Sequence, residues 1–246
     1  MPKDRYFIDQ DLKKNSSLEI KDKEAHHIKT LRKKMGEFVE VINGKGFLAK
    51  AKIENFDKKS IKIKIIDVFF EKEKKQKLIL VQAFIKPNKL EFLLEKTTEL
   101  GIDEIWLFKS KNSEKLNFSK NRLNRMKFIL IAAIKQSGRL YLPKIKIFDS
   151  IKDIKNFDSN KNIYFGDVEK KAKRYVDVYK NKTKQSNEDK KTSYFFIGPE
   201  MGFWKGEISY LKNNLQAIGV KLNSNILRAE TAAIAAISIA AHLLKL

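Results

Sequence analysis

The sequence contains no cysteine and only three histidines, four prolines and ten glycines among its 246 residues. The lack of cysteine excludes disulfide bonds and thiolate metal sites, and three scattered histidines provide little for any other metal site. We therefore expect no bound metal. No apolar run approaches the length that crosses a membrane, and the first residues lack the apolar segment of a signal peptide. These absences predict a cytoplasmic protein with no membrane partner.

Arginine is also scarce, since only seven of the 52 basic residues are arginine. With 30 acidic residues the formal net charge is +22, and so positive a surface attracts polyanions such as RNA. The alternative is that lysine accumulated through compositional drift of the genome and is merely solvated. Where lysine is the default cation, arginine is expected at positions that need a planar fork of donors. Four of the seven lie in segments discussed below: Arg32, Arg125, Arg139 and Arg228.

The pattern of residues 5–70 is mostly that of β-strands. Two apolar segments, 37–42 and 46–53, flank Asn43-Gly44-Lys45, which has the composition of a hairpin turn, and residues 60–65 alternate as a half-exposed strand does. One helix is expected to interrupt the β pattern before these strands, capped by Asp22 and running through Leu31. Several short strands with one helix predict a small barrel, followed by a charged linker at 71–77.

The pattern changes after this linker to alternating strands and helices. Strands are predicted at 78–85, 105–108, 145–148, 163–165, 194–197 and 220–222, and helices from Pro87 to Leu100 and at 121–136, 205–215 and 230–244. Strands that are apolar on both faces indicate an α/β domain with a mainly parallel sheet covered on both sides. Gly101 is expected to stop the first of these helices. Residues 180–192 are polar and are predicted to form a loop.

Two strand-to-loop junctions near the end of the chain indicate a ligand site. The strand at 194–197 runs into Gly198-Pro199-Glu200, and the strand at 220–222 is followed by a loop that reaches Arg228 at the start of an alanine-rich helix. Loops that follow parallel strands meet at the carboxyl edge of the sheet, where α/β proteins bind ligands.

Short motifs along most of the chain give it a resemblance to a known family. They are His27-Ile28, Leu31-Arg32, Gly36 and Gly44, then Lys96-x-Thr98-Glu99-Leu100-Gly101, Ser113-Glu114, Gln136-Ser137-Gly138-Arg139 with Pro143, the Gly-Pro-Glu loop, and Ile226-Leu227-Arg228-x-Glu230-Thr231-Ala232. In this order they resemble the SPOUT class of S-adenosylmethionine-dependent RNA methyltransferases, and within it the RsmE type. The resemblance implies methylation of N3 of a uridine in small-subunit (16S) ribosomal RNA.

The resemblance also implies an architecture. A PUA-like, RNA-binding β domain is expected over residues 1–72, and a SPOUT methyltransferase domain over 73–246 whose carboxyl-terminal segment forms a trefoil knot, a rare feature among folds. Members of the class are homodimers. The small residues of the last helix, such as Ala232, Ala236 and Ala240, permit close approach of another element, although a buried helix within one subunit has the same pattern.

The resemblance and the chemistry together indicate which residues to expect at the site. Loss of the uracil N3 proton requires an acceptor, and the charge that develops on O2 and O4 requires cationic donors. Glu200 and Glu230 are candidates for the first role, Arg139 and Arg228 for the second. S-adenosylmethionine is expected to contact Ile197, Gly198, Pro199, Glu200, Gly202, Leu222, Asn223, Ile226, Leu227, Thr231 and Ala232, and RNA to contact Arg5, Arg32, Lys33, Lys45 and Arg125.

Three residues depart from the family pattern. Met201 replaces the first of two paired glycines, and it would be strained if its φ were positive. Asn223, in place of another glycine, is expected to keep a left-handed turn, and Asn225 replaces an arginine.

Three alternative functions remain open at the level of the sequence. A methyltransferase of the same class that acts on another RNA, such as tRNA, and a non-catalytic RNA-binding dimer both fit the composition. A nucleotide-binding enzyme that uses Gly198–Gly202 as a phosphate loop is disfavoured, because no Lys-Ser/Thr follows a glycine at the required spacing.

Overall fold

A computed structural model describes residues 4–114, 117–183 and 192–244. By its internal contacts the chain divides into two units. The first comprises the chain up to Glu73 together with Ile131–Leu142, and the second comprises Lys74–Leu130 and the chain from Pro143 onward. The first unit thus includes a segment that lies far along the sequence, beyond the expected boundary at residues 72 and 73.

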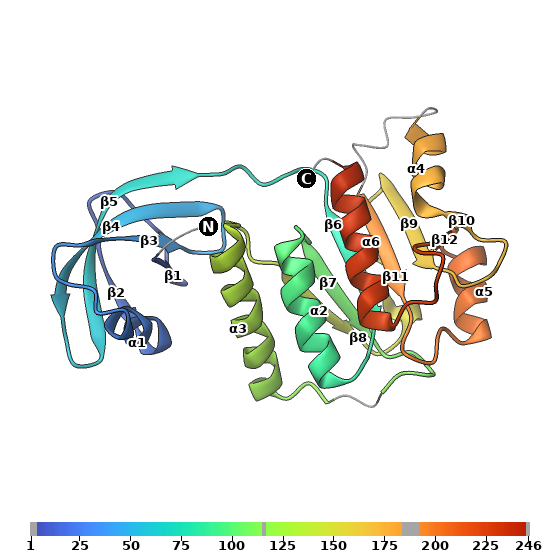
Figure 1. Ribbon diagram of the computed structural model, residues 1–246, viewed down its shortest axis with the longest axis horizontal. Coiled ribbons are helices and arrows are strands. Elements are labelled where there is room, and N and C mark those ends of the chain that lie inside the picture. The colour runs from blue at the N-terminus through green and yellow to red at the C-terminus, as the bar shows by residue number, and fades with distance from the viewer. Residues whose placement is uncertain (1–3, 115–116, 184–191, 245–246) are drawn as a thin grey trace. The chain divides into compact units, whose positions relative to one another are not determined.

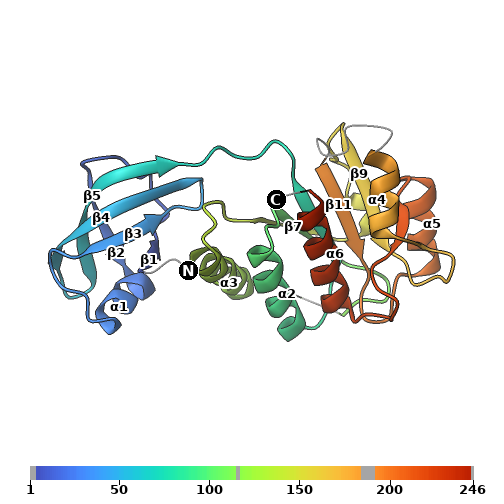
Figure 2. The same cartoon turned by 45° about the horizontal axis from the view of Figure 1, so that its top comes forward.

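The part of the first unit that precedes residue 74 is a curled, five-stranded sheet with one helix (Figure 2). Its elements are β1 (Arg5–Phe7), β2 (Ser17–Lys21), α1 (Asp22–Thr30), β3 (Phe38–Ile42), β4 (Phe47–Phe56) and β5 (Ser60–Phe70), and the strand order is β1-β3-β4-β5-β2. One residue in two along β4 and β5 is buried, and these side chains form a core with Ala25 and Ile28 of α1. The expected small β domain is therefore present as a half-barrel.

The turn between β3 and β4 follows the prediction. Gly44 and Gly46 have φ values of 72° and 90°, which favour glycine, and the Asn43 side-chain oxygen accepts hydrogen bonds from the Lys45 and Phe47 amides. The predicted cap of α1 was wrong. Asp22 is the first residue of the helix, and Lys21 occupies the N-cap position without a side-chain hydrogen bond.

The second unit contains a seven-stranded parallel sheet (Figure 1). Its strands, in the spatial order β10-β12-β9-β11-β6-β7-β8, are β10 (Lys173–Arg174), β12 (Ile218–Lys221), β9 (Lys161–Gly166), β11 (Thr192–Ile197), β6 (Leu78–Ala83), β7 (Glu104–Phe108) and β8 (Lys144–Phe148). The helical elements are α2 (Pro87–Glu99), α3 (Lys120–Ser137, whose end belongs to the first unit), the 3-10 turn η1 (Ile151–Asp153), α4 (Tyr175–Thr183), α5 (Lys205–Asn213) and α6 (Ala229–Leu243).

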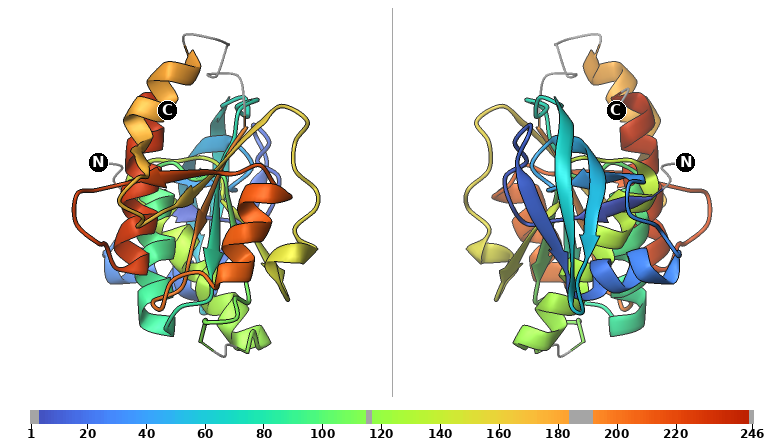
Figure 3. Two further views of the ribbon diagram at one scale, coloured as in Figure 1. Left: turned by 90° about the vertical axis from the view of Figure 1, so that its right-hand side faces the viewer. Right: turned by 90° about the vertical axis from the view of Figure 1, so that its left-hand side faces the viewer.

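Helices cover both faces of this sheet, as the apolar strands predicted. Figure 3 shows α5 on one face and α6 on the other. The side chains of Trp106, Phe165 and Phe196 pack with Leu211 of α5, whereas Tyr164 and Phe195 point to the opposite face and pack with Tyr175 of α4. The α/β class inferred from the sequence is thus confirmed.

The signals at the ends of α2 also agree with the structure. Pro87 lies in the first turn, and Gly101 follows the helix with a φ of 98°. The Gly101 and Ile102 amides donate to the carbonyls of Thr98 and Thr97, which are the two bonds of a Schellman motif.

Three elements of the second unit were not predicted, namely β10, α4 and the 3-10 turn η1. The expected loop at 180–192 was wrong at its start, because α4 continues to Thr183, and at its end, because β11 begins at Thr192. The remainder of that predicted loop, 184–191, lies outside the described residues.

Candidate cofactor pocket

A pocket of about 460 Å³ opens at the carboxyl edge of the parallel sheet. Three loops line it, and they follow β9, β11 and β12, which are adjacent in the sheet. Parallel strands that are neighbours end at the same edge, so residues 165–168, 197–203 and 220–227 converge although they are distant in sequence. The volume lies in the range typical of small-molecule sites, roughly 300–1,000 Å³.

The loop after β11 owes its shape to two glycines. A side chain at Gly198 would place its Cβ 3.1 Å from the Phe203 amide nitrogen and 3.2 Å from the Phe203 ring. The Gly202 amide donates a 2.9 Å hydrogen bond to the Pro199 carbonyl, and Gly202 has a φ of 73°. The residue of this turn with a positive φ is therefore Gly202. Met201 does not have a positive φ, so methionine at this position causes no backbone strain.

The loop after β12 turns by a different device from the one expected. Asn223 is not left-handed in the described part of the chain; instead its side-chain oxygen accepts a 3.0 Å hydrogen bond from the Asn225 amide. This is an Asx turn, in which a short polar side chain substitutes for a backbone contact. The predicted left-handed turn at Asn223 was wrong.

A buried glutamine joins the end of β6 to the Gly-Pro-Glu loop. The Gln82 side-chain nitrogen donates to the carbonyls of Ala83, Ile197 and Gly198 at 2.9, 3.5 and 3.3 Å. Its side-chain oxygen is buried and has no described hydrogen-bond partner. Gln82 thus orients the carbonyls at the start of the pocket loop.

The loop after β7 supports the same part of the pocket through α5. The Glu207 carboxylate is buried and accepts hydrogen bonds from the Ser110 hydroxyl at 2.8 Å, the Trp204 amide at 2.9 Å and the Lys111 amide at 3.1 Å. The Asn112 side chain donates to the Gly202 carbonyl at 3.2 Å. These bonds fix the loop after β11 at its far end.

Most of the residues predicted to bind the cofactor lie in this pocket. Ten of them line it: Ile197, Gly198, Pro199, Glu200, Gly202, Leu222, Asn223, Ile226, Leu227 and Ala232. Thr231 is exposed on α6 and does not line it. The prediction missed the end of β9 and the loop after it, which contribute Phe165, Gly166, Asp167 and Val168. The signal was present, because Gly166-Asp167 follows an apolar strand in the same way as Gly198-Pro199 does.

The rim of the pocket is unusually apolar for an exposed surface. Val168, Met201 and Ile226 all line the pocket, and they are 74, 81 and 84% exposed. Exposed apolar side chains that cluster around a cavity indicate a surface that a ligand or a partner covers.

The two candidate proton acceptors share one cation at the edge of this pocket. Lys89 Nζ of α2 lies 3.5 Å from Glu200 Oε1 and 3.7 Å from Glu230 Oε2. Glu200 also accepts a 3.3 Å hydrogen bond from the Lys86 amide. Glu230 Oε2 is buried without a hydrogen bond in the described structure, so this carboxylate retains capacity to accept one. Its neighbours Ala229 and Ala232 line the pocket.

Neither candidate cationic donor is a lining residue of the pocket. Arg228 is the exposed N-cap residue of α6 and is not a lining residue. Arg139 belongs to the first unit and follows Gly138, whose φ is 88°. Their catalytic roles stay predictions.

The basic residues predicted to bind RNA differ in how strongly they are held by other side chains. Arg5 donates through two nitrogens to Glu40, Arg125 likewise pairs with Glu91, and Lys33 contacts Asp4 and Glu37. Lys45 is exposed and lies 3.8 Å from Asp11. Arg32 is exposed, in the left-handed region with a φ of 55°, and has no ion pair among the described residues.

Comparison with known proteins agrees with this architecture of an α/β unit with an edge pocket and a separate β unit. Residues 72–241 match the family model of the RNA methyltransferase domain, and residues 20–66 match that of the RNA methyltransferase PUA domain. The chain belongs to this RNA methyltransferase family.

Individual relatives match over nearly their whole length. The chain is 30% identical to ribosomal RNA small subunit methyltransferase E of Rickettsia conorii, over 97% of this chain and 95% of the relative. It is 31% identical to the protein of the same name from Mesomycoplasma hyopneumoniae, over 94% and 95%. The fold matches the crystal structure of methyltransferase E from Neisseria gonorrhoeae bound to S-adenosyl methionine, with a TM-score of 0.85, 23% identity, and coverage of 99% of this chain and 98% of that one.

No helix in the described part of the chain is long and apolar enough to cross a membrane.

Proposed function

We propose that this protein is an S-adenosylmethionine-dependent methyltransferase that modifies N3 of a uridine in 16S ribosomal RNA of the small subunit. The observation that supports this most strongly is the pocket formed by the loops after β9, β11 and β12, in a chain of the RNA methyltransferase family. The names of the relatives direct the proposal to the small ribosomal subunit.

The residues of the pocket suit S-adenosylmethionine. Adenine fits among apolar side chains such as Ile197, Leu222 and Leu227, with backbone groups of the loops at its edges. The Asp167 carboxylate accepts a hydrogen bond from the Glu169 amide at Oδ1, and its Oδ2, 3.9 Å from Lys212 Nζ, has capacity to accept from a ribose hydroxyl. Asp167 and Glu200 bring negative charge to a pocket whose ligand has a positive sulfur.

The residues around the pocket position the reaction. When bound, S-adenosylmethionine supplies an activated methyl group on sulfur. The pocket loops would hold the cofactor and exclude water, so positioning of the two reactants would provide most of the acceleration. Glu230 or Glu200 accepts the N3 proton, with Lys89 near both carboxylates. Arg139 and Arg228 are proposed to stabilise the charge on the uracil oxygens.

The remaining features of the proposal concern the assembly. The β unit, expected over residues 1–72, holds RNA, while residues 73–246 perform the transfer as a homodimer in the cytoplasm with a carboxyl-terminal knot. A homodimer is supported by the apolar rim of the pocket. The small residues Ala236 and Ala240 of α6 are buried within the subunit and give it no support.

The decisive experiment compares ribosomal RNA from cells with and without this gene by mass-spectrometric nucleoside mapping. We expect 3-methyluridine at one position of 16S RNA to disappear with the gene, and the purified protein to restore it in vitro on small subunits with S-adenosylmethionine. An unchanged 16S profile together with loss of a methylated base in tRNA would replace the proposed substrate.

A further inference from the structure

One face of the first unit presents an aromatic and cationic surface to solvent. Phe38 of β3 lies opposite Lys52 of β4, which lies opposite Lys64 of β5. In the next rows, Lys50 lies between Glu40 and Asp67, and Leu48 lies opposite Phe69. Directly opposed residues share a face of the sheet, and the intervening residues are buried in the core on the other side. We call this surface, with Phe38, Lys50, Lys52, Lys64 and Phe69, the β3–β5 face.

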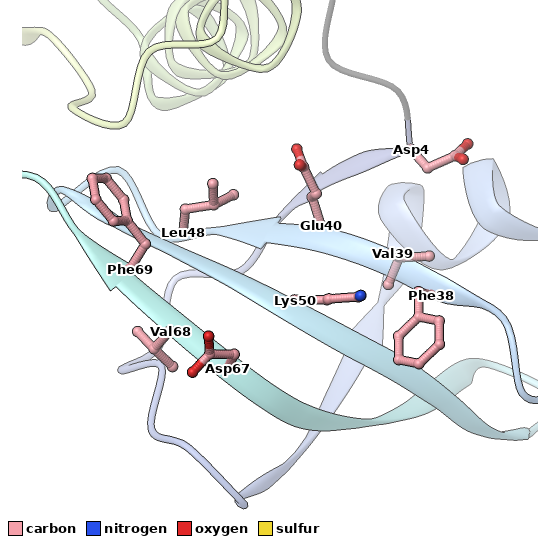
Figure 4. A pocket seen from close by; sticks show the side chains of 9 residues that line it. All are labelled: Asp4, Phe38, Val39, Glu40, Leu48, Lys50, Asp67, Val68 and Phe69. Carbon is pink, nitrogen blue, oxygen red and sulfur yellow. The ribbon is translucent and has the colours of Figure 1, made fainter.

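The β3–β5 face is hollowed and aromatic. A groove of about 410 Å³ is lined by residues of β3, β4 and β5 together with Asp4, and Figure 4 shows the Lys50 side chain between the strands that bear Phe38 and Phe69. Phe38 is 48% exposed and Phe69 58% exposed. Lys50 Nζ lies 4.5 Å from the centre of the Phe38 ring. Aromatic rings so exposed at one groove indicate a surface that binds a partner.

Three carboxylates and one ammonium group, that of Lys50, line the groove, and Lys52 and Lys64 lie beside it on the same face. Each of its carboxylates has a cationic neighbour, since Asp4 lies 2.7 Å from Lys33, Glu40 lies 2.7 Å from Arg5, and Asp67 lies 3.2 Å from Lys14. By contrast, Lys50, Lys52 and Lys64 have no ion pair in the part of the chain that the structure describes. These three cations therefore remain available to an anionic ligand.

Two of these lysines form an unfavourable pair. Lys52 and Lys64 are directly opposite each other on neighbouring strands, and both are exposed. Like charges at opposed positions destabilise a sheet. An anion bound between the two ammonium groups offsets their repulsion. The pair therefore favours binding of a phosphate at this place.

We propose that the β3–β5 face binds a single-stranded segment of the RNA substrate, with bases stacked on Phe38 and Phe69 and phosphates on Lys50, Lys52 and Lys64. A single-stranded nucleic acid carries both flat bases, which stack on aromatic rings, and anionic phosphates, which pair with ammonium groups. The β3–β5 face presents both kinds of partner. A protein partner fits less well, because lysine is depleted at protein interfaces. The inference rests on the proposed function only in taking RNA as the substrate.

The test measures affinity for a fluorescent oligouridine of about 12 nucleotides, a length in the range of single-strand sites. Phe38→Leu and Phe69→Leu keep an apolar side chain but remove the ring, and each is expected to weaken binding about tenfold with an unchanged salt dependence. Phe92→Leu is the matched control, since Phe92 is 49% exposed on α2 in the other unit, and its affinity should stay within twofold of wild type. Lys52→Gln and Lys64→Gln should each reduce the slope of log affinity against log salt by about 0.7.

Three results would overturn the inference. They are unchanged affinity in both phenylalanine variants, an unchanged salt slope in both lysine variants, or a shift from dimer to monomer by light scattering while RNA affinity is kept, which would make the face a contact between two copies. Thermal unfolding and cofactor titration of each variant identify any that fail to fold, and the remaining variants then decide. Nucleoside mapping separates this outcome from failure of the proposed function, since the enzyme can methylate 16S RNA whether or not this face binds it.

Discussion

Glu207 and Ser110 are joined by a 2.8 Å hydrogen bond although 97 residues separate them in the sequence. Both side chains are buried, and the same carboxylate also accepts from the backbone amides of Lys111 and Trp204. One carboxylate thus links the loop after β7 to the first turn of α5, next to the pocket.

Replacing this carboxylate should affect both stability and the pocket. Glu207→Ala leaves three donors without their acceptor, so we expect the free energy of unfolding to fall by about 2–3 kcal/mol. Cofactor affinity should also fall, because the far end of the Gly198–Phe203 loop loses its anchor. Denaturant unfolding and calorimetry measure the two effects. Glu19→Ala, an exposed residue of β2, is the control and should change stability by less than about 0.5 kcal/mol.

A side chain at Gly198 should close the pocket. In Gly198→Val the new Cβ meets the Phe203 amide nitrogen at 3.1 Å, so the loop must shift where it lines the pocket. We expect at least a tenfold loss of affinity for S-adenosylmethionine by calorimetry, while circular dichroism shows a folded protein. If the variant binds the cofactor as tightly as wild type, the pocket is not the cofactor site.

The two carboxylates near Lys89 should differ in what they do. Because Glu230 Oε2 is buried and retains capacity to accept a hydrogen bond, Glu230→Gln is expected to lower kcat by about a hundredfold or more with little change in cofactor affinity. Glu200 lines the pocket, so Glu200→Gln is expected chiefly to weaken cofactor binding. Single-turnover methylation and calorimetry on both variants test this. If kcat is normal in Glu230→Gln and reduced in Glu200→Gln, Glu200 is the proton acceptor and Glu230 is not.

Variants of Arg139 distinguish between two roles for this side chain, a donor that acts in the transition state and a contact to an RNA phosphate. Arg139→Ala is expected to reduce turnover at saturating RNA by roughly a hundredfold, since a donor aimed at developing charge acts in the transition state. Arg139→Lys should restore little of this rate if the planar fork is needed. An effect on RNA affinity alone would assign Arg139 to phosphate binding.

Glu104, the first residue of β7, lies at the end of the sheet opposite to the pocket. Its carboxyl group predicts how the free energy of unfolding depends on pH. Burial raises its pKa, but hydrogen bonds from Lys146 and Trp106 outweigh burial and hold the pKa below its ordinary value of 4.5. The stabilisation is therefore complete above pH 4.5 and is lost as the pH falls through the lowered pKa of the folded state. Glu104→Gln should reduce stability at neutral pH and flatten its decline below pH 4.5, measured by denaturant unfolding. Parallel curves for variant and wild type would contradict this.

The sequence predicted those parts of the site that depend on neighbouring residues. Gly198-Pro199-Glu200 and the turn at Asn43 are local signals, because strand, turn and glycine lie within a few residues of one another. The resemblance to the RsmE type added the cofactor and the substrate class, which no periodicity contains. Whether Met201 is strained depends on which residue of the turn has a positive φ. The sequence does not determine this, and the structure shows that the residue is Gly202.

Other features depended on contacts between distant segments. The bond between Ser110 and Glu207 cannot be read from either segment alone. The helix α4 was missed because its lysines and its polar continuation obscure the apolar face of Tyr175 and Tyr179, which is defined by packing against Tyr164 and the end of α6. The rings of the β3–β5 face alternate with lysines as an ordinary half-exposed strand does, so their exposure appears only in three dimensions.

The order of strands has a consequence for how the protein acquires its pocket. β6, β7 and β8 are neighbours in sequence and in the sheet, so they can pair as they are synthesised. β9 pairs with β11 and β12, both of which follow it in the chain, and β11 must first insert between β9 and β6. All three pocket loops belong to this late-pairing half. Contacts between distant segments form slowly, and a ligand that binds only the native state stabilises it. During refolding, the protein should therefore bind the cofactor only after β9, β11 and β12 have paired.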